Sequence, residues 1–251
     1  MELEYADDVL SITTLSCMSQ PCEALAVQPM AATAAHMLDV AERLFAQRGI
    51  DVVSIREIVR ESGQSNLSAA HYHFGSREAL VAALLTRRLR TINAIRHKRL
   101  DALEAAGLTG DVHAIVKATL IALAEVVKTT DWGPNYVRVV AQVILNSQSQ
   151  VIALVDPDTV SALVRGNKML RQVLMHLPPQ VFKDRIWIVN NESTYSLARW
   201  VYAHGPVSAA NRRRFDALLL NTVDFLAAGL LSPQGAKGHK AGSSQGPHHA
   251  S

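Results

Sequence analysis

The helices and turns in the N-terminal part of the chain are decided by residues 54–80, SIREIVRESGQSNLSAAHYHFGSREAL. Ser54 and Glu57 fit a capping box, in which the serine oxygen accepts from a backbone amide of the first turn and the glutamate reaches back to the amide of the cap. The pattern predicts a helix that starts at Ser54 and buries Ile58. Gly63 ends this helix after about two turns, because glycine readily adopts the left-handed conformation that follows a helix.

A second short helix is expected after the turn at Gly63. It begins at Ser65 or Asn66, both of which are good capping residues, and runs to His73. Two short helices joined by a glycine-containing turn are a candidate helix-turn-helix. We therefore expect this motif over residues 54–74.

Helices are also expected on both sides of the motif, because apolar residues recur every three or four positions and no sustained alternation favours strands. The first helix runs from a Thr33 cap to Gly49, and a long helix begins at a Ser76 cap and passes Leu100. Further helices are predicted over residues 111–128, 134–146, 156–176, 180–204 and 208–230. The expected fold is all-α, with an N-terminal three-helix domain, a C-terminal helical domain and about nine helices.

The long helix has an apolar side that is expected to face the core. The residues on that side are Leu80, Leu84, Leu85, Leu89 and Ile92. Its arginines, expected to lie largely elsewhere, are Arg87, Arg88, Arg90 and Arg96.

The two ends of the chain differ in composition from this helical body. Residues 1–30 hold five acidic and no basic residues, which is the wrong charge for the start of a secretion signal. Residues 232–251 are rich in Gly, Ser, Pro and His and have too little apolar surface to fold. We expect both ends to be disordered, and Met1, Met18 and Met30 all remain possible starts.

No apolar run approaches the ~20 residues that span a bilayer, so we expect a cytoplasmic protein with no membrane partner.

Metal and catalytic motifs are missing from the sequence. Cys17 and Cys22 fit no zinc spacing, and His71 and His73 would point about 200° apart on a helix. No nucleophile elbow, zinc-protease motif, phosphate loop or dinucleotide fingerprint is present. We therefore expect no metal, no cofactor and no enzymatic activity.

Basic residues are concentrated in one part of the chain. Residues 31–100 hold eleven Lys and Arg against six Asp and Glu, whereas the whole chain has a net charge of only +3. A local positive excess is typical of a surface that faces phosphates, because neutralised phosphates release their counterions.

Taken together, these elements resemble the DNA-binding domain of tetracycline-repressor type (TetR/AcrR) transcription regulators. The resemblance covers about residues 31–92 and rests on MLDVAERLF at 37–45, Gly49, SIREI at 54–58, Gly63 and YHFGSREAL at 72–80. Residues 93–231 resemble the family's helical ligand-binding and dimerisation domain only in length and number of helices.

The resemblance implies a homodimer whose second short helix enters the major groove of a double-stranded DNA operator. Tyr72 would contact a phosphate, with His73 beside it on the backbone and Phe74 packed inside. Ser54, Ser76 and Arg77 stand at helix starts, where they either donate to phosphates or simply cap. The candidates for reading bases are Ser65, Asn66, Ser68, Ala69 and His71.

The spacing departs from the usual family pattern at one place. Phe74 follows Gly63 by eleven positions rather than the ten that are usual in the family. The additional residue leaves the cap open between Ser65 and Asn66. A change of cap by one residue rotates the face of the helix that points at the bases by about 100° around the helix axis.

The second half of the chain mixes aromatic and amide side chains, which suits either a ligand pocket or the core and dimer interface. The pocket candidates are Trp132, Tyr136, Trp187, Asn191, Tyr195 and Trp200. The resemblance further implies dimerisation through the last two helices and repression that an unknown small-molecule effector relieves. Two alternatives are a transcriptional activator of the same fold and a helical ligand-binding protein that no longer binds DNA.

Overall fold

The computed structural model describes residues 32–64, 74–146 and 149–233. These residues form nine α-helices, one 3-10 helix and no strand, which confirms the predicted all-α class. None of the described helices combines the length and the apolar character needed to cross a membrane. The elements are α2 (Ala32–Arg48), α3 (Ile55–Glu61), α5 (Arg77–Ala105), α6 (Val112–Thr129), α7 (Gly133–Leu145), α8 (Ser149–Ala153), the 3-10 helix η1 (Pro157–Val160), α9 (Ser161–Val173), α10 (Pro179–His204) and α11 (Arg212–Leu231).

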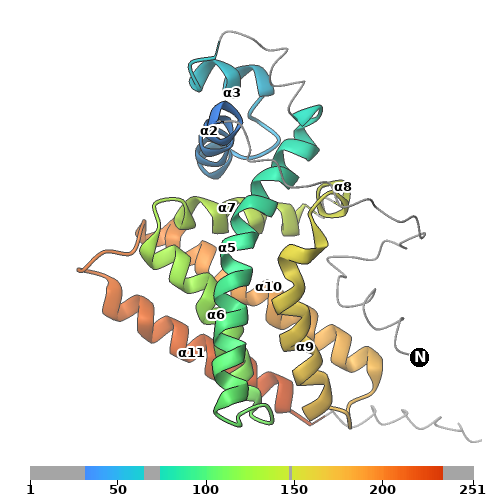
Figure 1. Cartoon of the computed structure of the whole chain (residues 1–251). Coiled ribbons are helices and arrows are strands. Elements are labelled where there is room, and N and C mark those ends of the chain that lie inside the picture. Colours follow the sequence, from blue (N-terminus) through green and yellow to red (C-terminus); the bar gives the residue numbers. More distant parts are fainter. Residues whose placement is uncertain (1–31, 65–73, 147–148, 234–251) are drawn as a thin grey trace, which may run out of the picture.

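The helices are arranged as a small head on a larger body (Figure 1). The head consists of α2, α3 and the first turns of α5, and its core contains the fully buried side chains of Phe45, Ile58 and Leu80. Phe74 is buried with them, as predicted. The 29 residues of α5 then continue without a break from the head into the body. The boundary expected near residue 92 therefore lies within one continuous helix.

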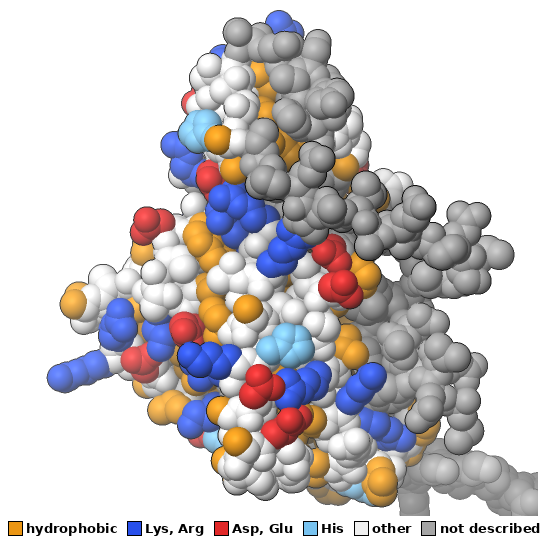
Figure 2. All heavy atoms as spheres, in the orientation of Figure 1, with side chains coloured by type: hydrophobic (Ala, Val, Ile, Leu, Met, Phe, Trp, Pro, Cys, Tyr) orange, Lys and Arg blue, Asp and Glu red, His pale blue; other side chains and the backbone are white. Residues whose placement is uncertain are grey.

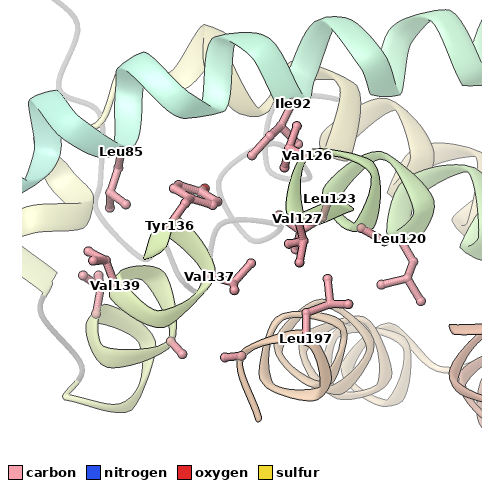
Figure 3. Packing of buried hydrophobic residues seen from close by; sticks show 14 of the residues in the cluster. Leu85, Ile92, Leu120, Leu123, Val126, Val127, Tyr136, Val137, Val139 and Leu197 are labelled. Carbon is pink, nitrogen blue, oxygen red and sulfur yellow. The ribbon is translucent and has the colours of Figure 1, made fainter. Parts of the chain in front are cut away.

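The body is built around α6, which packs between α5 and α11, while α7 packs against α10. Apolar side chains from these five helices meet in one core, part of which Figure 3 shows. The start of α7 lies directly against the backbone of α6. A Cβ on Gly133 would stand 2.2 Å from the carbonyl oxygen of Val126, so this crossing requires glycine.

Several helix ends are set by the residues that the sequence indicates. The side chains of Ser54, Ser76 and Asp111 each accept a hydrogen bond from a backbone amide of the helix that follows. Gly49 and Gly63 have φ values of 104° and 69°, in the left-handed region that favours glycine.

Only one half of the predicted capping box forms. The Ser54 oxygen accepts from the amide of Glu57 at 3.2 Å. The Glu57 carboxylate, however, pairs with Arg48 at the end of α2 instead of returning to the amide of Ser54. The glutamate therefore ties α3 to α2, and the serine alone caps α3.

The helix predicted over residues 156–176 is divided into η1 and α9. The Asp156 side chain accepts from the amide of Asp158, and the Thr159 hydroxyl donates to the Asp156 carbonyl, which tightens the turn after Pro157. The last predicted helix starts at Arg212 rather than near residue 208 because the Asn211 side chain organises the preceding turn. Helix α8 was not predicted.

Candidate functional site

Two serines of the head cap helices on its surface. The Ser54 oxygen accepts from Glu57, and the Ser76 oxygen accepts from the amide of Ala79 at 3.0 Å. A serine hydroxyl that accepts in this way retains its own hydrogen for donation. Capping and phosphate binding are thus compatible at both serines.

Three arginines add positive charge to the same head. Arg77 donates to the carbonyl of Asp51 at 3.3 Å, which joins the start of α5 to the loop after α2. Arg43 and Arg56 are exposed and form no ion pair with any described residue. Arg56 lies in the first turn of α3, next to the Ser54 cap. Arg56 was not among the predicted contact residues, although a basic residue in the first turn of a helix-turn-helix is a recognisable signal.

The remaining predicted DNA contacts lie outside the described residues. They are Ser65, Asn66, Ser68, Ala69, His71, Tyr72 and His73. The choice between Ser65 and Asn66 as the cap of the second helix therefore stays a prediction.

Arg88 connects the body to the head through a buried ion pair. Its Nη2 lies 2.6 Å from both Glu42 Oε2 and Asp39 Oδ1 of α2, and Glu42 is only 2% exposed. Burial raises the pKa of Glu42, while the hydrogen bonds and positive charge of Arg88 act in the opposite direction. The Arg88 guanidinium also stands over the Trp132 ring, 4.6 Å from its centroid. Figure 2 shows further Lys and Arg side chains around the junction of head and body.

Gln142 forms a second connection, from α7 to the head. Its Nε2 donates to the carbonyl of Phe45 at 3.1 Å, and its Oε1 accepts from the amide of Ile50 at 2.9 Å. One side chain thus holds both sides of the turn that ends α2. Asn146 adds a longer contact to Asp51 at 3.4 Å.

A cavity of about 160 Å³ lies inside the body. Its wall is mostly apolar and comes from α5, α6, α7, α10 and the segment that contains η1. The lining residues are Leu85, Leu89, Arg96, Thr119, Leu120, Leu123, Tyr136, Val140, Val143, Ile144, Ile152, Val155, Pro157, Val160, Leu163, Asn190, Ser193 and Thr194.

Three polar side chains in this wall are buried, and one of them, Thr194, donates its hydroxyl hydrogen to the carbonyl of Asn190. Arg96 is 8% exposed, and its Nε donates to the carbonyl of Thr119 at 3.3 Å. Tyr136 is 2% exposed and lies beneath α5, between Leu85 and Ile92 in Figure 3. Burial raises the pKa of Tyr136 and lowers that of Arg96.

The expectation that the arginines of the long helix lie away from its apolar side is wrong at two positions. Arg88 and Arg96 are both buried. Arg88 is accommodated by the carboxylates of α2, whereas Arg96 lies on the same face as Leu85 and Leu89 and lines the cavity.

Residues 37–84 match the family model described as bacterial regulatory proteins, tetR family. The head of this chain therefore resembles the DNA-binding domain of TetR-type regulators.

Solved structures of similar fold cover most of this chain. The fatty acid degradation regulator FadR of Bacillus halodurans aligns with 80% of this chain and 97% of its own, at 11% identity and a TM-score of 0.56. FadR of Bacillus subtilis, solved with stearoyl-CoA, aligns with 78% and 98%, at 9% identity and a TM-score of 0.52. The ketosteroid regulator KstR2 of Mycobacterium tuberculosis aligns with 77% and 95%, at 20% identity and a TM-score of 0.50. At such identities the similarity concerns the fold. No curated protein sequence matches the chain.

The side chains predicted for the ligand pocket lie in several different parts of the body. Tyr136 lines the cavity, and Trp132 lies under Arg88. Trp200 is buried between His204 and Phe215. The other three are on α10, where Trp187 is half exposed, Asn191 is buried and Tyr195 is partly buried, and the cavity is lined instead by Asn190, Ser193 and Thr194.

Large apolar side chains are exposed along the last two helices. Phe225 is 70% exposed and Tyr202 is 81% exposed. The other exposed apolar residues of α10 and α11 are Trp187, Ile188, Leu220 and Leu231.

Proposed function

We propose that this TetR-type regulator is a homodimeric repressor that binds an operator in double-stranded DNA and is released by a small molecule held in the body cavity. The observation that carries the proposal is that cavity residues and head-holding residues are neighbours in the sequence. Leu89 lines the cavity and Arg88 holds Glu42 of the head. Val143 lines the cavity and Gln142 holds the turn after α2.

A ligand in this cavity acts on the head through α5 and α7. A ligand shifts a conformational equilibrium only by as much as it binds one state better than the other. A ligand that fits best when α5 or α7 has moved therefore favours a rotated head. The two heads of a dimer must stand about 34 Å apart to enter successive major grooves, so a rotation that misaligns them weakens DNA binding.

The proposed DNA-binding surface combines the exposed helix starts of the head with the segment that follows Gly63. Ser54, Ser76 and Arg77 donate to phosphates, and Arg56 adds a further positive charge. Residues 65–73 supply the base contacts and the phosphate contact of Tyr72. The proposed domains are residues 31–92 for DNA binding and 93–231 for ligand binding and dimerisation, and the protein acts in the cytoplasm, where bacterial DNA lies.

The dimer is proposed to form through α10 and α11. Exposed apolar patches of this kind mark protein interfaces, because water contact with them is unfavourable. The exposed apolar residues of these two helices are Trp187, Ile188, Tyr202, Leu220, Phe225 and Leu231.

An electrophoretic shift experiment tests the proposal. Full-length protein is mixed with DNA from either side of its own gene at moderate salt, with unrelated DNA of equal length as the control. We expect selective retention of one fragment. A Tyr72→Phe variant is expected to weaken binding to all sequences similarly, since a phosphate contact carries no base information. Failure to retain any neighbouring fragment would contradict the repressor.

A further inference from the structure

Arg96 occupies a position where a leucine would be expected. It follows Leu85, Leu89 and Ile92 on one face of α5, at the spacing of successive helical turns. The leucines and Arg96 all line the cavity. The stripe therefore brings a guanidinium into an otherwise largely apolar space.

This guanidinium has no negative partner among the residues that the structure describes. Its one hydrogen bond to protein runs from Nε to the carbonyl of Thr119, which leaves both Nη groups for the cavity. Two other arginines of α5 have negative partners. Arg88 and Arg99 each pair with a carboxylate. A buried charge without a partner is costly, so Arg96 is expected to serve a ligand rather than stability.

Tyr136 adds a second donor to the same space. Its hydroxyl forms no hydrogen bond with another described residue, and its proximity to Arg96 affects the pKa of both groups. Because burial keeps the phenol protonated, it offers a hydrogen to an acceptor. The hydroxyls of Thr119, Ser193 and Thr194 already donate to backbone carbonyls of their own helices. Arg96 and Tyr136 thus provide one cation and one neutral donor, and the partly buried amide of Asn190 also lies in the wall.

We propose that the effector of this regulator is a small apolar molecule with a single carboxylate, which pairs with Arg96 and accepts from Tyr136. This inference rests on the proposed function of the cavity as the effector site. A planar guanidinium matches the two oxygens of a carboxylate. A phosphate ester carries about −1.5 to −2 charges and would require more donors than the cavity supplies. The apolar part of the ligand contacts Leu120, Leu123 and Val140.

The volume of the cavity limits the size of this ligand. At about 160 Å³ it is close to the apolar cavity of about 150 Å³ that accepts benzene in another protein. Phenylacetate and hexanoate are therefore suitable probes, and their amides are neutral molecules of nearly the same shape.

The experiment measures the binding of five compounds to the full-length protein by titration calorimetry without DNA. The probes are phenylacetate, phenylacetamide, hexanoate and hexanamide, and phenyl phosphate is added as the dianion. We expect each acid to bind about ten- to a hundredfold more tightly than its amide, as a charge-assisted contact implies. Arg96→Met is expected to remove this preference, and Tyr136→Phe to reduce it by a smaller factor.

The control is Lys98→Met, which removes one positive charge from an exposed position on the same helix and is expected to leave the preference unchanged. Thermal unfolding distinguishes a loss of binding from a loss of folding, because it measures the stability of each variant directly. Arg96→Met should melt no lower than the natural protein, because it removes an unpaired buried charge, and phenylacetate should raise the melting temperature of the natural protein only.

Three results would overturn the inference. They are equal binding of acid and amide by the natural protein, an unchanged preference in Arg96→Met, and tighter binding of phenyl phosphate than of phenylacetate. A complete lack of acid binding at millimolar concentration also contradicts it. An acid that binds without changing DNA affinity would instead contradict the release mechanism and leave the ligand class standing.

Discussion

At the scale of single residues, Arg88 joins the two parts of the molecule. It is almost fully buried, and both of its carboxylate partners, Asp39 and Glu42, belong to α2 of the head. The two charges of such a pair depend on each other, because either one alone would be left buried without compensation.

Arg88→Met is therefore expected to destabilise the protein strongly. Loss of the cation leaves Glu42 buried and unpaired, which costs about 3–5 kcal/mol in comparable pairs. Urea unfolding followed by circular dichroism measures the change. Arg90→Met is the matched control, because the Arg90 pair with Asp156 is exposed and should contribute at most about 1 kcal/mol. Equal effects of the two variants would show that the buried pair does not hold the head.

The sequence predicts some of these residue roles and not others. Ser54, Ser76 and Asp111 are recognisable as caps because a cap acts within one helical turn. The partners of Arg88 and Arg96 are not recognisable, because α2 and α6 approach α5 only in the folded chain. The pattern of apolar positions alone predicts that arginines lie on the solvent side of α5. Arg88 and Arg96 are nevertheless buried.

At the scale of elements, α7 is both a wall of the cavity and a support of the head. Val140 and Val143 line the cavity, and Gln142, between them in sequence, reaches two backbone groups of the head. The helix is fixed at its start by the close approach of Gly133 to α6. A displacement of α7 therefore reaches the head mainly through the end of α7 that carries Gln142.

Gln142→Leu is expected to loosen the turn after α2 while the body stays intact. The amide of Ile50 loses its acceptor, so its hydrogen exchange should accelerate by about tenfold or more, as the loss of one hydrogen bond implies. Exchange in α11 should not change. Gln180→Leu is the control, because Gln180 bonds only to Asp184 on the surface of α10. If Ile50 exchanges equally in all three proteins, Gln142 does not couple α7 to the head.

Element boundaries illustrate what local sequence information provides. The bounds of α3, α6 and α7 agree with the predicted ones within one or two residues, because capping and turn residues mark them. The division of the helix after Asp156 was missed, since Pro157 fits the first turn of either an α-helix or a 3-10 helix. The start of α11 was missed because Asn211 folds back on residues that precede it.

At the scale of the whole molecule, the proposed dimer determines how many heads bind one DNA molecule. A single head offers few phosphate contacts, whereas two heads on one body bind the same DNA together and gain from their effective concentration. Helices α10 and α11, which carry the exposed apolar side chains, lie in the body, away from the head (Figure 1). Dimerisation there leaves both heads accessible.

Phe225→Asp is expected to shift the protein from dimer to monomer. Phe225 is 70% exposed in the single chain, and an aspartate within the proposed apolar interface would be buried without a partner. Light scattering coupled to size exclusion measures the mass. Leu108→Asp is the control, because Leu108 is also exposed but lies in the loop between α5 and α6. A Phe225→Asp protein that keeps the mass of a dimer would exclude this interface.

The fold class and helices α2 and α3 of the head were predictable from the sequence, because periodicity and capping are local. The cavity was not. Its wall comes from five separate segments, and of the side chains selected for it only Tyr136 lies in it. Trp200 was selected for its aromatic ring, but it fills the core against Phe215.

The central claim is that the head binds DNA through its cationic surface, and a salt series measures this most directly. Fluorescence anisotropy of a labelled duplex from beside the gene gives the association constant of the full-length protein at several salt concentrations. We expect the logarithm of the association constant to fall linearly with the logarithm of the salt concentration. Arg56→Ala should reduce the slope by about 0.9 for each phosphate contact that is lost. No binding at low salt, or binding whose strength does not depend on salt or on Arg56, would contradict the claim.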